Sequence, residues 1–211
     1  MRSSPAASLA LVMIALATAA CSESNDPQDV ADARVPSISA IAGYVSDDQL
    51  QAMVAAGALS AEAYQDLATV RQVTAPFHRI DVAEASGWPR DVTGCLDFPD
   101  GYMDFGPGAM GHHWLNVPAY LDGGVLDVST PEALLYETQA DGSLRLTAVE
   151  YIIPERFRPR TDPPPVMFGR QMMFHPQFAA WGLHVWLWLD NPYGLFADVN
   201  PRVGCQYAVQ Q

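Results

Sequence analysis

The chain between residues 46 and 77 repeats its apolar positions at helical spacing. In SDDQLQAMVAAGALSAEAYQDLATVRQVTAPF, apolar residues recur every three or four positions, which is typical of helices that bury one face. Ser46 is a favourable N-cap, and the acidic residues that follow it suit the first turn of a helix. Gly57 predicts a break between two helices. A further helical turn is expected over 81–88, ahead of Pro89.

Beyond Cys95 the pattern changes to short runs rich in β-branched and aromatic residues. Four such runs predict strands, at 112–117, 132–138, 144–153 and 181–189. The Ala-Asp-Gly turn between the second and third predicts an antiparallel hairpin, whereas 154–170 is a proline-rich loop. We therefore expect an α+β fold, with N-terminal helices packed on an antiparallel sheet or small open β-barrel, as a single domain over 44–211.

Alternation along two of these strands places a charge and a histidine among apolar neighbours. The face of 144–153 that carries Glu150 is otherwise apolar, with Leu144, Leu146, Ala148 and Ile152. His184 is expected to share its face with Trp186 and Trp188. Because an isolated buried carboxylate is costly, Glu150 needs a partner, and a histidine on a facing strand is an economical one.

Two adjacent histidines in AMGHHWLN (109–116) are expected to point to opposite sides of their strand. His113 shares its side with a leucine and a valine, which is an inward-facing pattern, so we expect it to meet Glu150 and His184. His112 is expected to be a partly exposed neighbour. The glycines that precede the pair are expected to let the backbone pass close to the site.

The convergence of His113, Glu150 and His184 would form a two-histidine, one-carboxylate set of the kind that binds a divalent metal ion. His175, in MFHPQF, is a candidate fourth group. A core hydrogen-bond network with no metal explains the same pattern. Both interpretations stay open at the level of sequence, because the residues are far apart in the chain and match no compact metal-binding motif.

Residues near His113, Glu150 and His184 are expected to form the rest of the pocket. Asn116 or Trp186 is expected to shape access to the site, and Trp188 to line the same pocket. If the site is catalytic, Glu150 is the expected general acid–base group, because an apolar strand face raises the pKa of a carboxyl group. An alternative function is non-enzymatic binding of a small apolar or aromatic molecule through Trp114, Trp186 and Trp188, with the histidines and glutamate purely structural.

Composition and missing motifs exclude several function classes. The formal net charge is −13, and all 11 basic residues are arginines, so nucleic acid is not an expected partner. Schiff-base chemistry is excluded because the chain has no lysine. Hydrolysis through a serine nucleophile is not expected, because the chain has no Gly-x-Ser-x-Gly motif of the kind that presents such a serine. GPGAMG (106–111) precedes a strand rather than a helix, which removes the basis for a phosphate-binding loop. His78 has no evident partner and is expected to be structural.

The N-terminus predicts export. Residues 1–20 have one charge followed by a short apolar run and small residues, which is typical of a signal peptide. The sequence LATAAC resembles a lipobox, so Cys21 is a candidate lipidation site, followed by an acidic tether over 21–43. We expect a lipoprotein of the cell envelope that faces the periplasm and contacts the membrane through its N-terminal lipid. A soluble periplasmic or secreted protein is the alternative.

With Cys21 lipidated, Cys95 and Cys205 remain. In an oxidising compartment such a pair most simply forms a disulfide. A catalytic or metal-bound thiol is the competing interpretation, but there is no Cys-x-x-Cys or close Cys–His spacing to support it.

Several segments together resemble a family of uncharacterised exported bacterial proteins and lipoproteins. These segments are GAMGHHWLN, PEALLYE, LRLTAVEYIIP and LHVWLWLDNPYGLFADVNPRVGC, within residues 65–206. The resemblance implies no established activity. It singles out His113, Asn116, Glu137, Glu150, His184, Asn191, Asn200 and Cys205. Family members have a longer segment with a further histidine just before the His184 position, where this chain has Ala179, Ala180 and Trp181.

Overall fold

A computed structural model describes Met1 and residues 43–209 of the 211-residue chain. Apart from Met1, these residues belong to one compact unit, Val35–Gln211. The expected signal peptide, Cys21 and all of the expected tether except Gly43 lie outside the described residues. Among the helices of 43–209, none has the length and apolar character that crossing a membrane requires.

Helices gather at the start of the described chain, as the apolar spacing predicts. Ser46 and Ser60 cap the first two, each accepting a hydrogen bond from a backbone N–H three residues ahead. Gly57 separates these helices with a φ of 71°, a conformation that favours glycine. In chain order the helices are α1 (Asp47–Ala55), α2 (Ala61–Thr74), the 3₁₀ helix η2 (Ala75–His78), α3 (Ile80–Ala85) and α4 (Val117–Tyr120).

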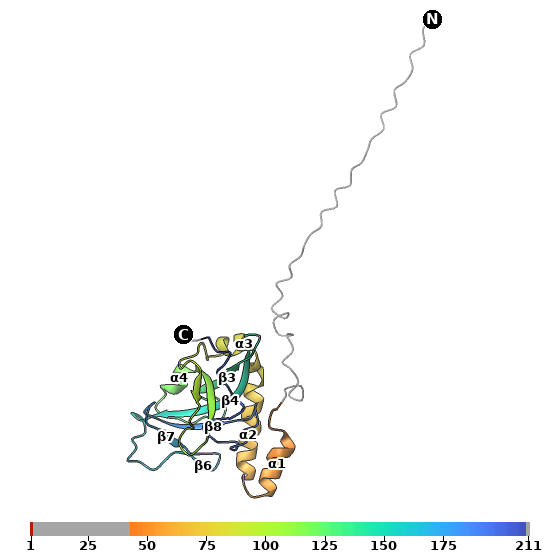
Figure 1. The fold of residues 1–211 in the computed structure, drawn as a ribbon. Coiled ribbons are helices and arrows are strands. Elements are labelled where there is room, and N and C mark those ends of the chain that lie inside the picture. Colours follow the sequence, from red (N-terminus) through yellow and green to blue (C-terminus); the bar gives the residue numbers. More distant parts are fainter. Residues whose placement is uncertain (2–42, 210–211) are drawn as a thin grey trace. The chain divides into compact units, whose positions relative to one another are not determined.

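The rest of the fold is built on a curled, antiparallel six-stranded sheet of order β1-β2-β3-β4-β8-β7 (Figure 1). Its strands are β1 (Leu96–Phe98), β2 (Gly108–Leu115), β3 (Ala133–Thr138), β4 (Leu144–Pro154), β7 (Met173–His175) and β8 (Ala180–Val185). A separate two-stranded hairpin consists of β5 (Val166–Met167) and β6 (Arg170–Gln171). The predicted α+β class, with helices packed on an antiparallel sheet, is confirmed.

Helices α1, α2, η2 and α3 pack on one face of the sheet, which we call the helix face. Buried aromatic residues of β3 and of the segment that follows β8 hydrogen-bond to the helices through their polar tips, which both anchors the layers and satisfies the buried groups. The Tyr136 hydroxyl donates to the Phe77 carbonyl at 2.7 Å, and Trp188 Nε1 donates to Thr74 Oγ1 at 3.0 Å. The helix layer is therefore positioned by directional contacts as well as by apolar burial.

The opposite face, which we call the inner face, has its own apolar cluster. It contains Ala109, Met110, Ala133, Leu135, Ala148, Trp186, Val199 and Val203. The C-terminal segment 190–205 packs here, and an isolated antiparallel bridge joins Ala109 to Asn200. Val199 and Val203 of this segment pack on the inner face, whereas Leu195 belongs to the cluster of the helix face.

A β-bulge in β4 changes the predicted faces of that strand. Leu135 pairs with Ala148, but the next residue, Tyr136, pairs with Leu146, which leaves Thr147 as the extra residue. Leu146 therefore packs on the helix face, whereas Ala148 lies on the inner face. The prediction that Leu146 shares the face of Glu150 is wrong, because alternation holds only beyond the bulge.

Strand β8 is shorter than the predicted 181–189 run, because it ends at Val185. Past this point the backbone leaves the β4 ladder, with the Trp186 N–H donating to the Leu195 carbonyl at 2.9 Å. Trp186 remains on the inner face, but Trp188 packs on the helix face. The prediction that Trp186 and Trp188 share a face is therefore wrong.

The predicted disulfide is present and links Cys95 to Cys205 with a Cα–Cα distance of 5.7 Å. It fastens the segment before β1 to the C-terminal segment across 110 residues of sequence. In the chain-entropy account, closing a loop of this size in the unfolded chain stabilises the fold by about 4–5 kcal/mol.

Glu132, just before β3, is a buried carboxyl group that is 1% exposed. Its Oε2 accepts a hydrogen bond from the Ile152 N–H at 2.9 Å, but burial still raises the pKa of Glu132 from 4.5 to about 8. The native protein thus retains this proton to higher pH than the unfolded chain. The associated stability is present below pH 4.5 and is lost as the pH rises toward about 8, by up to about 1.4 kcal/mol per pH unit.

Replacing this group with a neutral isostere should remove its pH dependence. We expect the free energy of unfolding of Glu132→Gln, relative to the unmodified protein, to increase by about 2–4 kcal/mol between pH 5 and pH 8. Urea unfolding of both proteins at several pH values measures this difference. A difference that stays constant across the range would show that Glu132 is ionised in the native protein.

Candidate functional site

Strand register brings the three predicted site residues together on the inner face. Glu150 of β4 lies directly opposite His184 of β8, and opposite Ala133 of β3 on its other side. His113 of β2 pairs with Leu135, which lies two residues beyond Ala133 along β3 and therefore on the same face of the sheet. The small side chain of Ala133 leaves room for the Glu150 carboxylate to extend toward His113.

Gly111 interrupts the regular alternation of side chains along β2 and so decides which side of the strand His113 faces. Met110 and His113 are three residues apart, yet both line the same cavity, which strict alternation along a strand does not allow. Gly111 resets the alternation with a φ of 84°, and a Cβ there would lie 2.5 Å from the Tyr136 carbonyl oxygen. The backbone does approach closely at this glycine, but the approach is to the neighbouring strand β3 rather than to the site.

The polar atoms of the three residues form a buried cluster, which we call the His/Glu cluster. His113, Glu150 and His184 each offer one ligand atom within 4.8 Å of the others. His113 Nε2 lies 3.5 Å from Glu150 Oε2, and His184 Nε2 lies 3.9 Å from Glu150 Oε1. The residues are 4%, 7% and 0% exposed, respectively. This group could hold a metal ion.

Neighbours on the far side of each imidazole define its protonation. The Thr93 hydroxyl donates to the Gly94 carbonyl at 2.7 Å, so its oxygen is free to accept from His113 Nδ1, which is 3.1 Å away. His184 Nδ1 faces Asp198 Oδ1 at 3.6 Å. With a proton on each Nδ1, both Nε2 lone pairs are directed toward Glu150, as in metal-binding histidines that are oriented by outer partners.

Burial and mutual charge shift the pKa of each residue in the cluster. Burial, reinforced by the nearby His184, lowers the pKa of His113 to about 3. Burial raises the pKa of Glu150. Burial opposes charge on His184 too, but the Glu150 and Asp198 carboxylates outweigh it and raise the pKa of His184. The site therefore favours one positive charge beside Glu150 and the neighbouring Asp198, whether a proton or a metal ion provides it.

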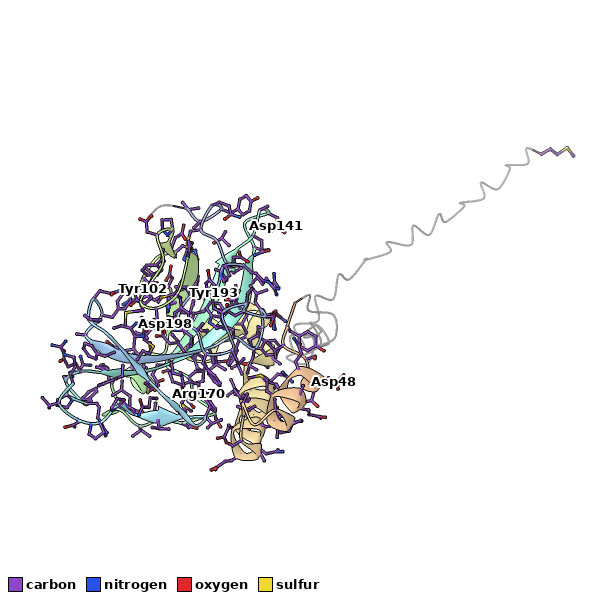
Figure 2. All side chains as sticks on the ribbon, turned by 60° about the horizontal axis from the view of Figure 1, so that its bottom comes forward. Asp48, Tyr102, Asp141, Arg170, Tyr193 and Asp198 are labelled. Carbon is purple, nitrogen blue, oxygen red and sulfur yellow. A yellow bond between two sulfur atoms is a disulfide. The ribbon has the colours of Figure 1, made fainter. Side chains whose placement is uncertain are left out.

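His175, the predicted fourth group, lies next to the cluster at the end of β7. Its Nδ1 is 2.8 Å from the Tyr102 hydroxyl and its Nε2 is 3.7 Å from Asp198 Oδ1; Tyr102 and Asp198 are labelled close together in Figure 2. Gly182 leaves space between the groups, because a Cβ there would lie 2.7 Å from Glu150 Oε1 and 2.8 Å from His175 Nε2. His175 thus approaches the site but is not one of the three clustered ligands.

A cavity of about 240 Å³ leads from this cluster to the surface. His113, Glu150 and His175 are among the residues that line it. Two of its lining residues, Val92 and Phe178, are 46% and 42% exposed, which places its opening at these side chains. The remaining lining residues are Thr93, Leu96, Met110, Leu115, Tyr120, Ile152, Ala180, Trp181 and Gly182.

The residues predicted to shape or line the pocket do not line this cavity. Asn116 caps α4, where its side chain accepts from the Ala119 N–H at 3.2 Å. Trp186 stacks on His184 with ring centroids 6.0 Å apart and is fully buried behind it. Trp114 and Trp188 are on the helix face. Trp186 therefore supports the site from behind, and the predicted three-tryptophan binding surface does not exist.

His112 is buried, not partly exposed as predicted, with 6% of its surface accessible. It points to the opposite side of β2 from His113, as predicted, and packs beside Trp114 on the helix face. Its Nδ1 is 2.7 Å from Asp91 Oδ2 and its Nε2 is 3.1 Å from Thr138 Oγ1. Asp91 also accepts from the backbone N–H of His113 at 3.2 Å, so this pair helps to position the strand.

Three of the residues singled out by the family resemblance form hydrogen bonds with backbone groups of the C-terminal segment. Glu137 Oε1 accepts from the Gly204 N–H at 3.0 Å, and Asn191 Nδ2 donates to the Val199 carbonyl at 2.9 Å. Asn200 Oδ1 accepts from the Arg202 N–H at 2.9 Å. The Glu137 contact joins the segment that contains Asp198 to β3, whereas the contacts of Asn191 and Asn200 lie within that segment and fix its path.

Sequence reasoning missed Asp198, Thr93, Tyr102 and Gly182. Asp198, Thr93 and Tyr102 lie in segments without regular alternation, so alternation could not place them. Gly182 lies in β8, where alternation does put it on the face of His184, but a glycine has no side chain that would mark it as part of a site. Comparison with protein-family models, with curated proteins and with solved structures finds no match to this chain. The site must therefore be interpreted from its own geometry.

Proposed function

We propose that this chain is a cell-envelope protein that binds one divalent metal ion through His113, Glu150 and His184. The observation that supports this most is the orientation of the two imidazoles. Each presents its Nε2 to one oxygen of the same buried carboxylate, and each has an outer oxygen partner at Nδ1, namely Thr93 or Asp198.

The separations within the cluster favour an ion over a direct hydrogen-bond network. The N–O distances of 3.5 and 3.9 Å exceed the range of about 2.7–3.2 Å for an N–H···O bond. Ligands about 2.0–2.1 Å from a tetrahedral ion lie about 3.3 Å apart, close to the shorter of these distances. Within the described residues, the Nε2 of His184 is buried without a hydrogen-bond partner, a state that is costly unless a ligand binds it.

The ligand set suggests the kind of metal and the chemistry. Two imidazoles and one carboxylate suit zinc or iron(II), and three protein ligands leave at least one coordination position open. His113 and Glu150 line the cavity but His184 does not, so the open position is directed into the cavity. An ion bound there supplies Lewis-acid character to an oxygen or nitrogen atom that enters from the cavity.

Metal binding should depend on the cluster residues. Full-length protein purified without a histidine tag should bind about one equivalent of Zn²⁺ or Co²⁺, as measured by elemental analysis and isothermal titration calorimetry. His113→Ala, His184→Ala and Glu150→Gln should each lower the affinity more than about 100-fold, because removing a ligand should cost more than removing an outer partner. Failure to bind either ion, or unchanged affinity in these variants, would refute the metal site.

Two further variants separate ligand loss from general damage to the fold. His78→Ala removes a half-buried histidine, which packs against Trp188 on the helix face, and should leave metal affinity unchanged. Thr93→Val keeps every ligand but removes the outer partner of His113, and should weaken binding by about 10–100-fold. Equal losses in all variants would indicate instability rather than coordination.

We also propose that the protein is anchored to a membrane through a lipid on Cys21. The Cys95–Cys205 disulfide supports an oxidising compartment, and the LATAAC sequence supports lipidation. Cys21→Ser should move the protein from the membrane fraction to the soluble fraction of fractionated cells, as measured by immunoblotting. Unchanged fractionation would argue for another mode of attachment or none.

A further inference from the structure

The cavity beside the His/Glu cluster indicates what kind of molecule reaches the metal. We propose that it binds a neutral, mainly apolar molecule of about ten to twelve non-hydrogen atoms, whose single oxygen or nitrogen donor occupies the open coordination position. This inference rests on the proposed metal site, and it adds the class of ligand to it.

The size of the cavity limits the ligand. A space of about 240 Å³ accommodates about ten to twelve non-hydrogen atoms at the packing density of protein interiors. It is smaller than the sites of about 300–1,000 Å³ that bind drug-sized molecules. A single aromatic ring with a short substituent, or a short alkyl chain, fits this limit.

The walls of the cavity specify an apolar body. Leu96, Met110, Leu115, Ile152 and Phe178 supply apolar side chains along its length. Trp181 also lines it, but its indole N–H is already bonded to the Arg158 carbonyl at 2.8 Å. The surface between the opening and the cluster therefore stabilises a ligand by apolar burial and offers few groups for polar recognition.

Polar groups suited to a donor head are found at the inner end of the cavity. His113 and Glu150 line it there, together with His175, whose Nε2 is buried without a hydrogen-bond partner among the described residues. Gly182 leaves open the space between Glu150 Oε1 and His175 Nε2. A donor atom at the metal would thus have the imidazole of His175 as a second polar contact.

Charge at the site favours a neutral ligand. The Glu150 and Asp198 carboxylates together balance the charge of one divalent ion. No arginine contributes to the wall of the cavity within the described chain, and the sequence contains no lysine. An anionic head would therefore bring an uncompensated charge into a buried site of a strongly acidic protein.

Two probes of equal size test this class directly. 4-Phenylimidazole and cinnamate each have about eleven non-hydrogen atoms, but the first is neutral and the second is an anion at pH 7.5. We would titrate each, and imidazole, into Co²⁺-loaded full-length protein and follow the visible absorption of the cobalt. 4-Phenylimidazole should bind at least about tenfold more tightly than imidazole, because its ring is buried, and at least about tenfold more tightly than cinnamate.

A variant at the opening tests whether the probe enters through the cavity. Val92→Trp should lower the affinity for 4-phenylimidazole at least about tenfold, because Val92 is a half-exposed residue that lines the cavity. The affinity for Co²⁺ should be unchanged, because Val92 is not a metal ligand. Val166→Trp is the matched control, since Val166 is 59% exposed and lies outside the cavity wall. It should bind all probes like the unmodified protein.

The outcomes separate this inference from the proposed function. If Co²⁺ binds but imidazole or cinnamate binds as tightly as 4-phenylimidazole, the metal site stands and the proposed ligand class is wrong. If Val92→Trp and Val166→Trp behave alike, the cavity is not the route to the metal. If Co²⁺ does not bind at all, both proposals fail.

Discussion

Burial of the Glu150 carboxylate is the constraint on which the inner face of this protein depends. A charge on an apolar strand face needs compensation, and the pairing of β4 with β8 places His184 directly opposite it. Ala133 and Gly182 keep the space around the carboxylate open. His113 reaches it from β2, and the Thr93 hydroxyl and the Asp198 carboxylate orient the two imidazoles from outside. Relatively small changes in strand register would separate these groups.

The C-terminal segment completes the site and explains why the fold is fastened there. This segment contains Asp198 and packs on the inner face, but it forms no strand of the main sheet. Side chains of Glu137, Asn191 and Asn200 satisfy its backbone groups, and the Cys95–Cys205 disulfide joins it to the segment before β1. Thr93 lies just before that disulfide, so both outer partners of the cluster are in segments that the same covalent link restrains.

Sequence periodicity could predict the central residues of the site but not their surroundings. Alternation identified His113, Glu150 and His184, because each lies in a strand stretch where the period of two holds. It failed where the strands are irregular, as at the Thr147 bulge, which turns Leu146 to the helix face, and beyond Val185, where Trp188 leaves the face of His184. Asp198 could not be predicted, because its contact with His184 depends on the path of a non-periodic segment.

The most direct test of the central claim is the position of the ion itself. Crystals of the protein loaded with Zn²⁺ or Co²⁺ would be measured at the absorption edge of the metal, and the anomalous difference map would locate it. The account predicts one strong peak about 2.0–2.2 Å from His113 Nε2, His184 Nε2 and an oxygen of Glu150. A cluster without a peak, or a peak only at exposed acidic residues, would contradict it.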